Sequence, residues 1–144
     1  TRQHFSTFLV ENGYAKNQSD VFKRYLVKGK PGYVSATWPT LEETVTLINA
    51  AGGVAVIAHP LRYKMTATKC RNMIKEFKAL GGKAIEVVTG HNQSHEIEIA
   101  TGYAKRYDVA ASMGSDFHNG ETSWGQLGQL AALPPGLTPV WELW

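Results

Sequence analysis

The sequence has few of the features that mark secreted or membrane-spanning proteins. It contains one cysteine, Cys70, which cannot form a disulfide within the chain. It has no run of 18 or more apolar residues, about the length that a membrane-spanning helix requires. It does not begin with the basic and apolar leader of a secreted protein. These absences favour a reduced, cytoplasmic setting.

Charge of one sign is also not in large excess. The formal net charge is +3 over 144 residues, which suits an anionic ligand such as a nucleotide but does not select one. The hydrophobic share of 43% is ordinary for a globular chain, and the length suffices to bury a core without disulfides or structural metals. Because the chain begins with Thr1-Arg2 rather than methionine, we expect that a further segment precedes it.

The first part of the chain, residues 1–39, is predicted to be helical. Apolar residues at helical spacing predict a helix over residues 4–11, which Gly13 closes. A second helix follows, with Asn17 or Ser19 as its N-cap. Glycine and proline then predict a loop over residues 28–32.

From residue 40 the pattern becomes α/β. Thr40 with Glu43 is typical of a helix N-terminus, and the apolar run 54–58 predicts a strand that is buried on both faces. Helices are expected at 40–51, 66–80 and 94–107, and strands at 54–58, 83–88 and 109–113. Repeated helix-then-strand units predict parallel strands joined by right-handed crossovers. Three strands are too few to close a barrel, so residues 40–144 form a piece of a sheet or of a larger barrel.

Histidine and aspartate follow two of the three predicted strands. His59 comes after the first strand, and Asp116 and His118 come after the third. The carboxyl ends of parallel strands meet at one edge of a sheet, and imidazole with carboxylate suits zinc, manganese or iron. Each residue also has a structural interpretation: His59 as a hydrogen-bonded loop residue, and Asp116 as the cap of a turn. Their occurrence at one edge favours a metal site, whereas His91 and His95 are interpreted as solvated.

Two arginines are candidates for binding phosphate. Arg62 lies on the loop after the first strand, where a guanidinium can hold a phosphate through two hydrogen bonds. Arg2 lies at the start of the first helix, where a cation opposes the helix dipole unless an anion is near. The structural alternatives are a surface ion pair for Arg62 and a frayed terminus for Arg2.

These motifs resemble the polymerase-and-histidinol-phosphatase (PHP) family of metal-dependent phosphoesterases. The resemblance covers nearly the whole chain and rests on Arg2 to Phe5, Ala51 to Tyr63, Gly114 to His118 and Pro139 to Trp141. The sequence is most similar to the TrpH/YciV branch, whose members are nucleoside 3′,5′-bisphosphate phosphatases. Its RNase AM type also trims RNA from the 5′ end. The resemblance implies a fold: the C-terminal part of a distorted β/α barrel (residues 40–144), preceded by a helical insert (residues 1–39).

The resemblance also implies roles for individual residues. It makes His59, Asp116 and His118 metal ligands, with Asp116 and His118 also catalytic. The phosphate contacts would be Arg62, Arg2 and His4. Glu86 would contact the metal ligands without binding the metal itself. The implied cofactor is a cluster of divalent ions, Mn²⁺ first, with Zn²⁺, Fe²⁺ and Mg²⁺ open. The family's early His-x-His motif and its further ligands are absent, so the chain looks like a fragment.

Three hypotheses follow. The first is hydrolysis of nucleoside 3′,5′-bisphosphates or of short RNA from its 5′ end, with divalent ions lowering the pKa of a bound water from about 15.7 to near 7. The chain alone is expected to be nearly inactive because most ligands are missing. The second is a non-catalytic nucleotide- or RNA-binding module, for which Tyr63 beside Arg62 and Lys64 would supply stacking and charge. The third is a homodimer formed through exposed sheet edges.

Overall fold

The chain divides into two compact units. The computed structural model describes residues 1–90, 92–118 and 127–144. We call Thr1–Trp38 the helical unit and Pro39–Trp144 the sheet unit. Within the described residues, no helix has the length and apolar character needed to cross a membrane. That residues 1–39 are an insert in a barrel stays a prediction.

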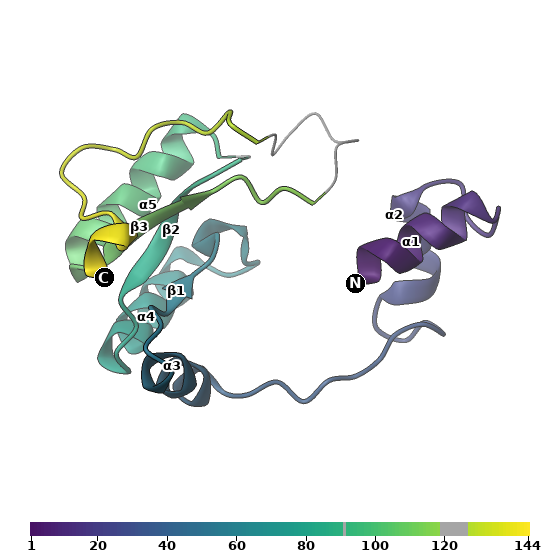
Figure 1. Ribbon diagram of the computed structural model, residues 1–144, viewed down its shortest axis with the longest axis horizontal. Helices are drawn as coiled ribbons and strands as arrows, with labels where there is room; N and C mark the ends of the chain where they lie inside the picture. Colours follow the sequence, from purple (N-terminus) through teal and green to yellow (C-terminus); the bar gives the residue numbers. More distant parts are fainter. Residues whose placement is uncertain (91, 119–126) are drawn as a thin grey trace. The chain divides into compact units, whose positions relative to one another are not determined.

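The helical unit contains three short helical segments (Figure 1). They are α1 (Arg2–Glu11), α2 (Gln18–Val21) and a π-helical turn, η1 (Phe22–Leu26). Of the two predicted caps, Asn17 is the one that forms, because its side chain accepts a hydrogen bond from the Asp20 N–H at 3.0 Å. The small core of this unit consists of Ala15, Val21 and Leu26.

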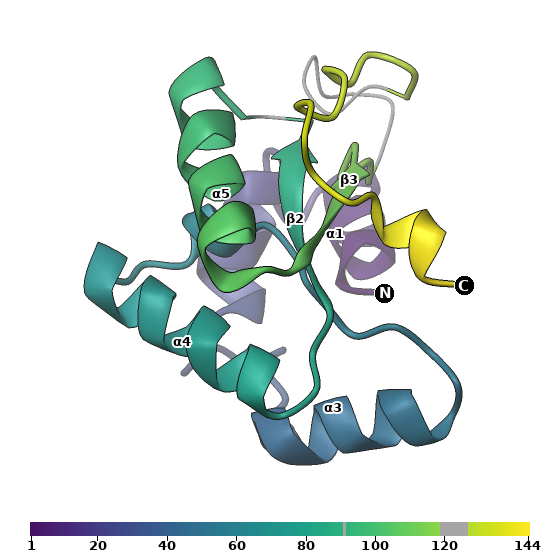
Figure 2. The ribbon, with the colours of Figure 1, turned by 90° about the vertical axis from the view of Figure 1, so that its left-hand side faces the viewer.

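The sheet unit has three parallel strands in the order β1-β2-β3, as the helix-then-strand pattern predicts. The strands are β1 (Val56–Ile57), β2 (Ala84–Thr89) and β3 (Ala110–Gly114). The helices are α3 (Leu41–Ala50), α4 (Ala67–Ala79) and α5 (Ser94–Tyr107), with 3-10 turns η2 (Pro60–Arg62) and η3 (Val140–Leu143). In Figure 2, α4 and α5 lie on the same side of the sheet. The fold class predicted from the sequence is confirmed.

The first strand differs from its prediction. Residues 54–58 were expected to be buried on both faces, but only Val56 and Ile57 pair as a strand, and Val56 is 38% exposed. The reason is that β1 is an edge strand, which pairs only with β2 among the described residues. An apolar groove of about 280 Å³ lies beside it, between α3 and α4.

The other edge of the sheet is covered by the C-terminal segment. The N–H of Ala111 in β3 donates to the carbonyl of Thr138 at 2.8 Å, and Ala111 forms a parallel bridge with Pro139. Between the two edges, the core is built from fully buried apolar side chains such as Ile74 of α4 and Ile85 of β2. This core holds the carboxyl ends of the strands in place.

The predicted N-cap at Thr40 forms a capping box, which gives a test of the fold. The Glu43 N–H donates to Thr40 Oγ1 at 3.2 Å, and Glu43 Oε2 accepts from the Thr40 N–H at 2.7 Å. We expect Thr40→Ala to lower the free energy of unfolding by about 1 kcal/mol. Thr46→Ala, an exposed change within the same helix, should be neutral or slightly stabilising because alanine favours helix. Urea denaturation followed by circular dichroism measures both; equal losses would contradict the capping argument.

Candidate functional site

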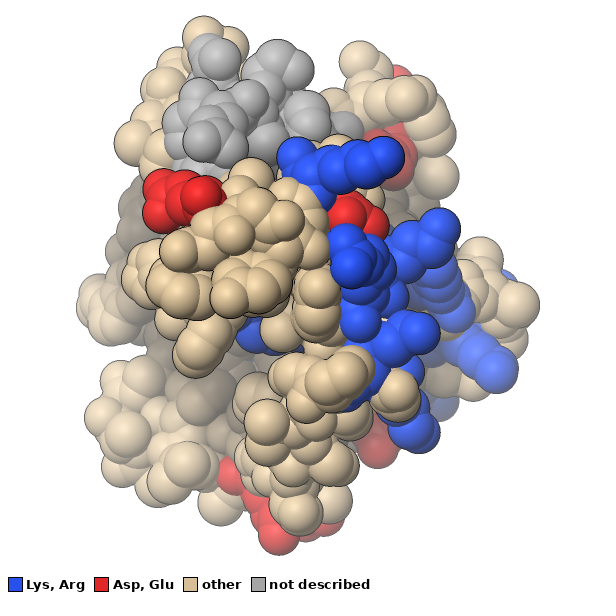
Figure 3. Space-filling model, turned by 90° about the vertical axis from the view of Figure 1, so that its right-hand side faces the viewer, with Lys and Arg blue, Asp and Glu red and all other residues tan. Residues whose placement is uncertain are grey.

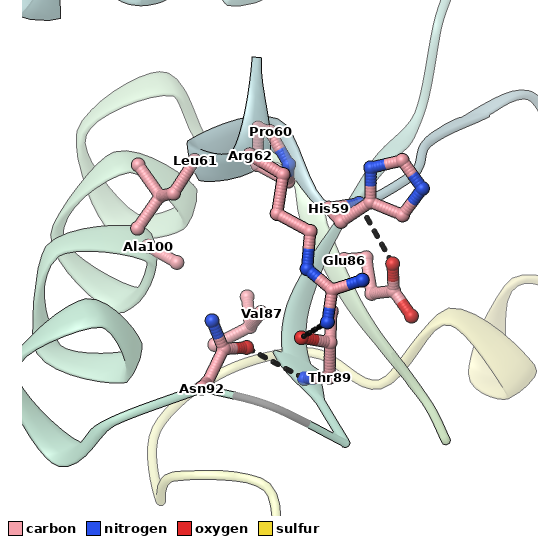
Figure 4. Close-up of a pocket in the computed structure, with 9 residues that line it drawn as sticks. All are labelled: His59, Pro60, Leu61, Arg62, Glu86, Val87, Thr89, Asn92 and Ala100. Atoms are coloured by element: carbon pink, nitrogen blue, oxygen red, sulfur yellow. Dashed lines mark hydrogen bonds between the residues drawn. The ribbon is translucent and has the colours of Figure 1, made fainter. Parts of the chain in front are cut away.

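The predicted site residues of the sheet unit gather at the carboxyl ends of the strands. His59 follows β1, Glu86 lies in β2, and Asp116 lies two residues after β3. A pocket at this edge is lined by the loop after β1, by β2 and by the start of the β2–α5 connection (Figure 4). Because the strands are parallel, their side chains reach a common space although they are far apart in sequence.

His59 and Glu86 form the first link across this edge. The backbone N–H of His59 donates to Glu86 Oε2 at 2.7 Å, as Figure 4 shows. His59 has a left-handed backbone (φ 32°), which is unusual for a residue with a Cβ and costs about 1–3 kcal/mol. Gly114 of β3 leaves room on the other side, since a Cβ there would lie 2.9 Å from Glu86 Oε1. The Glu86 carboxylate is therefore enclosed by the loop after β1 and by β3.

This enclosure changes the acidity of Glu86. Burial raises the pKa of the Glu86 carboxyl above its usual range, and the neighbouring Asp116 carboxylate raises it further. The hydrogen bond from the His59 N–H and the charges of His59 and Arg62 oppose this rise. The Glu86 carboxylate thus interacts with His59, Asp116 and Arg62, and its supporting role for the metal ligands stays a prediction.

Arg62 joins the ends of all three strands. Its Nη1 pairs with Asp116 Oδ2, and its Nη2 donates to Thr89 Oγ1 at 3.2 Å. Figure 4 shows the side chain extending from the turn after β1 to the end of β2. In this state Arg62 forms an ion pair, as in the structural interpretation of the sequence, but its partner is the predicted ligand Asp116.

Asp116 and His118 form the second predicted group. His118 Nε2 lies 3.3 Å from Asp116 Oδ1, and the His118 side chain is 70% exposed. Asp116 also has a left-handed backbone (φ 54°). Three non-glycine residues have a positive φ among those described. Two of them are His59 and Asp116, and the third, Asp108, is the C-cap of α5. Unusual backbone conformations concentrate at functional sites, and here they coincide with predicted ligands.

The remaining predicted residues lie elsewhere. Arg2 and His4 belong to the first turn of α1 in the helical unit, where His4 Nδ1 lies 3.3 Å from the terminal nitrogen of Thr1. Their roles as phosphate contacts stay predictions. His95 is exposed on the first turn of α5. His91 lies outside the described residues.

The donor atoms of this edge fit a divalent ion in kind. His59 Nδ1 is buried and has no hydrogen-bond partner among the described residues. The carboxylates of Glu86 and Asp116 are close enough to interact electrostatically, and Glu86 also interacts with His59. Imidazole nitrogen with carboxylate oxygen is the ligand set of zinc, manganese and iron sites. The number of these donor atoms is too small for a complete site. Within residues 1–90, 92–118 and 127–144, no three His, Cys, Asp or Glu side chains are placed to hold one ion.

Thr89 and Asn92 were not assigned roles from the sequence. Thr89 is 5% exposed, its hydroxyl accepts from Arg62, and its N–H donates to Asn92 Oδ1 at 2.6 Å. The only signal in the sequence was the position of Thr89 at the end of a predicted strand. Thr89 positions Arg62 through this hydrogen bond, and Asn92 contributes indirectly because it holds the backbone of Thr89.

The contact between Arg62 and Thr89 is testable through stability. Thr89→Val keeps the shape of the side chain and removes the acceptor, so we expect the free energy of unfolding to fall by about 1 kcal/mol. Thr101→Val is the matched control, because the Thr101 hydroxyl is buried without a hydrogen-bond partner in the described parts of the chain. It should leave stability unchanged or raise it. A loss for Thr101→Val as large as that for Thr89→Val, in urea denaturation, would refute this account of the contact.

Sequence comparison finds relatives among bacterial phosphatases and nucleases. The chain is 43% identical over 142 residues to a 3′,5′-nucleoside bisphosphate phosphatase of Chromobacterium violaceum, covering 99% of this chain and 50% of the relative. It is 41% identical over 144 residues to the 5′-3′ exoribonuclease Rnm of Escherichia coli, covering 49% of that protein. No family model matches the chain.

Comparison with solved structures also finds bacterial enzymes, each matched over about half of its chain. An amidohydrolase from Chromobacterium violaceum, with bound sulfate and no metal, matches 99% of this chain and 49% of its own, with a TM-score of 0.83 and 42% identity. A proposed metal-dependent phosphoesterase from Bifidobacterium adolescentis matches with a TM-score of 0.67 and 25% identity, over 48% of its chain. The chain thus spans about half the length of the curated relatives it matches. The resemblance predicted from the motifs is confirmed. The whole length of this chain is homologous to about half the length of each of these bacterial bisphosphate phosphatases and 5′-3′ exoribonucleases.

Proposed function

We propose that this chain is part of a metal-dependent phosphoesterase of the PHP family. Its reaction would be removal of phosphate from nucleoside 3′,5′-bisphosphates, or trimming of short RNA from the 5′ end. The observation that carries the proposal is the convergence of His59, Glu86, Asp116 and Arg62 at one edge of the sheet. Relatives of 40–43% identity named for these two activities support the substrate class.

In this proposal His59, Asp116 and His118 hold divalent ions, with further ligands supplied from beyond the described residues. Glu86 orients the loop of His59 through its hydrogen bond with the backbone N–H. Divalent ions, when bound, lower the pKa of a coordinated water and neutralise negative charge on phosphoryl oxygens. Manganese is the metal we propose first, and the cytoplasm is the proposed location.

Arg62 would bind the phosphate of the substrate. Its guanidinium already bridges Asp116 and Thr89, so it is held at the open edge of the sheet. A cation held by Asp116 would offset the charge of its carboxylate and weaken the attraction between Asp116 and Arg62. Two parallel N–H groups of Arg62 would then be available for a phosphate. Arg2 and His4 are proposed as further phosphate contacts.

Metal binding tests the ligand assignment without any turnover. We expect Asp116→Asn to weaken Mn²⁺ binding by at least about 10-fold, measured by electron paramagnetic resonance of free Mn²⁺. Asp108→Asn is the matched control: Asp108 is also an aspartate with positive φ, but its side chain is 98% exposed at the end of α5. It should bind Mn²⁺ like the unchanged chain.

The same variants separate the enzyme from its alternative, the non-catalytic nucleotide- or RNA-binding module. If Asp116→Asn binds adenosine 3′,5′-bisphosphate as tightly as the unchanged chain, with and without EDTA, the binding module is favoured. Few donors are brought together here, so we expect only slow phosphate release from the 144-residue chain itself. Release as fast as that of the Chromobacterium violaceum relative would contradict this expectation.

We also propose that two copies of the chain associate through the β1 edge. The outer edge of β1 has no strand beside it in the described structure, and the exposed Val56 lies on an apolar groove. Val56→Lys should shift a dimer to monomer in light scattering, since a charge on an edge strand opposes pairing. Leu47→Lys, at an exposed residue of α3 outside the groove lining, should leave the mass unchanged. A monomeric mass of the unchanged chain at all concentrations would contradict the proposal.

A further inference from the structure

The positive charge of the protein is concentrated in the helical unit. Residues 1–38 contain six Lys and Arg against two Asp and Glu, a formal net charge of +4. Residues 39–144 contain nine Lys and Arg against ten Asp and Glu, a net charge of −1. The excess charge therefore belongs to about a quarter of the chain, whereas the proposed catalytic edge lies in the sheet unit.

Four lysines of this unit carry free charge. Lys16, Lys23, Lys28 and Lys30 are all exposed, and we call them the basic patch. Among the described residues the helical unit contains one ion pair, between Arg24 and Asp20, and none of the four lysines takes part in an ion pair. In the space-filling view of Figure 3, where Lys and Arg are blue, several of these side chains lie close together. Such a group of unneutralised cations attracts polyanions.

The loop that carries two of these lysines is held in a defined shape. The Lys30 N–H donates to the Val27 carbonyl at 3.0 Å, with Gly29 between them at a left-handed φ of 84°. The Gly32 N–H donates to the carbonyl of Tyr25 in η1 at 2.8 Å, which ties the loop back to the π-helical turn. Lys28 and Lys30 are thus presented on an ordered turn rather than on a free tail.

Aromatic rings accompany the basic patch. Tyr14 is 57% exposed and Tyr33 is 40% exposed, and the Tyr33 N–H donates to the Lys30 carbonyl at 2.9 Å. The Arg24 guanidinium lies 5.1 Å from the centre of the Tyr25 ring, and both side chains donate hydrogen bonds to the carbonyl of Tyr14. Exposed rings among cations are the surface that single-stranded nucleic acids use, because bases stack on the rings while phosphates contact the cations.

We propose that the helical unit binds the phosphodiester backbone of a single-stranded nucleic acid through the basic patch, with Tyr14 and Tyr33 available for base stacking. This binding surface lies outside the proposed catalytic edge and goes beyond the proposed function. It needs neither a metal nor turnover.

Fluorescence anisotropy with a labelled 12-nucleotide RNA in EDTA tests the proposal on the 144-residue chain. If all four lysines contact phosphates, the logarithm of the association constant should fall with the logarithm of salt concentration with a slope of about −2.8. The double variant Lys28→Glu, Lys30→Glu should reduce that slope by about 1.4 and weaken binding at least about 10-fold in 50 mM salt. The milder pair Lys28→Ala, Lys30→Ala should lower the affinity in the same direction, and circular dichroism checks that both variants are folded.

The control is Lys69→Glu with Lys75→Glu, two exposed lysines of α4 in the sheet unit. It produces the same net charge as the first variant, and we expect affinity within about twofold of the unchanged chain. A DNA strand of the same sequence distinguishes the ligands: equal binding shows that the 2′-hydroxyls are not recognised, and tighter RNA binding shows that RNA is preferred. Loss of affinity equal in both double variants, or no binding of either strand in 50 mM salt, would overturn the proposal. Because EDTA prevents metal binding, that result would leave the proposed catalysis untouched.

Discussion

The guanidinium of Arg62 connects the loop after β1 with Thr89 at the end of β2 and with Asp116 after β3. The strands themselves are joined by backbone hydrogen bonds and by the core beneath them, and Arg62 adds a side-chain contact that their polar ends share. One side chain with five N–H donors supplies that contact. The same property is the basis of the phosphate-binding role proposed for Arg62, which already pairs with one anionic group at this edge of the sheet.

The site combines this contact with backbone strain. His59 and Asp116 both adopt left-handed conformations, and Gly114 leaves the space that the Glu86 carboxylate occupies. Each feature costs stability or removes packing, and the surrounding sheet compensates through fully buried residues such as Ile85. A carboxylate whose pKa is raised by burial, next to a second carboxylate and an arginine, is an arrangement that favours function over stability.

The two units differ in their physical character. The sheet unit has a continuous apolar core and nearly balanced charge, whereas the helical unit has a small core of three buried residues and most of the excess positive charge. The relatives, which are twice as long as the matched region, include both nucleotide phosphatases and exoribonucleases.

Local sequence patterns were sufficient to predict the secondary structure and the edge of the sheet that carries the polar residues. Helix periodicity, the Thr40 capping box and the glycines after α1, α3 and α4 act over a few residues, so the sequence shows them directly. The parallel order of the strands also followed, because helix-then-strand repeats permit few topologies. Two of the motifs on which the resemblance to a phosphoesterase family rested, Ala51 to Tyr63 and Gly114 to His118, lie at these same strand ends.

Contacts between distant residues were decided only by the tertiary structure. The pairing of Arg62 with Asp116, 54 positions away, and the roles of Thr89 and Asn92 depend on the register of three strands, which no local pattern encodes. The short, half-exposed β1 was also not predicted, because an apolar run indicates that residues can be buried, not what covers them. The sequence by itself determined where most of the helices and strands lie and which chemical groups follow the strands. The tertiary structure decided how much of the first strand forms and which of those groups meet, because both depend on packing across the whole sheet.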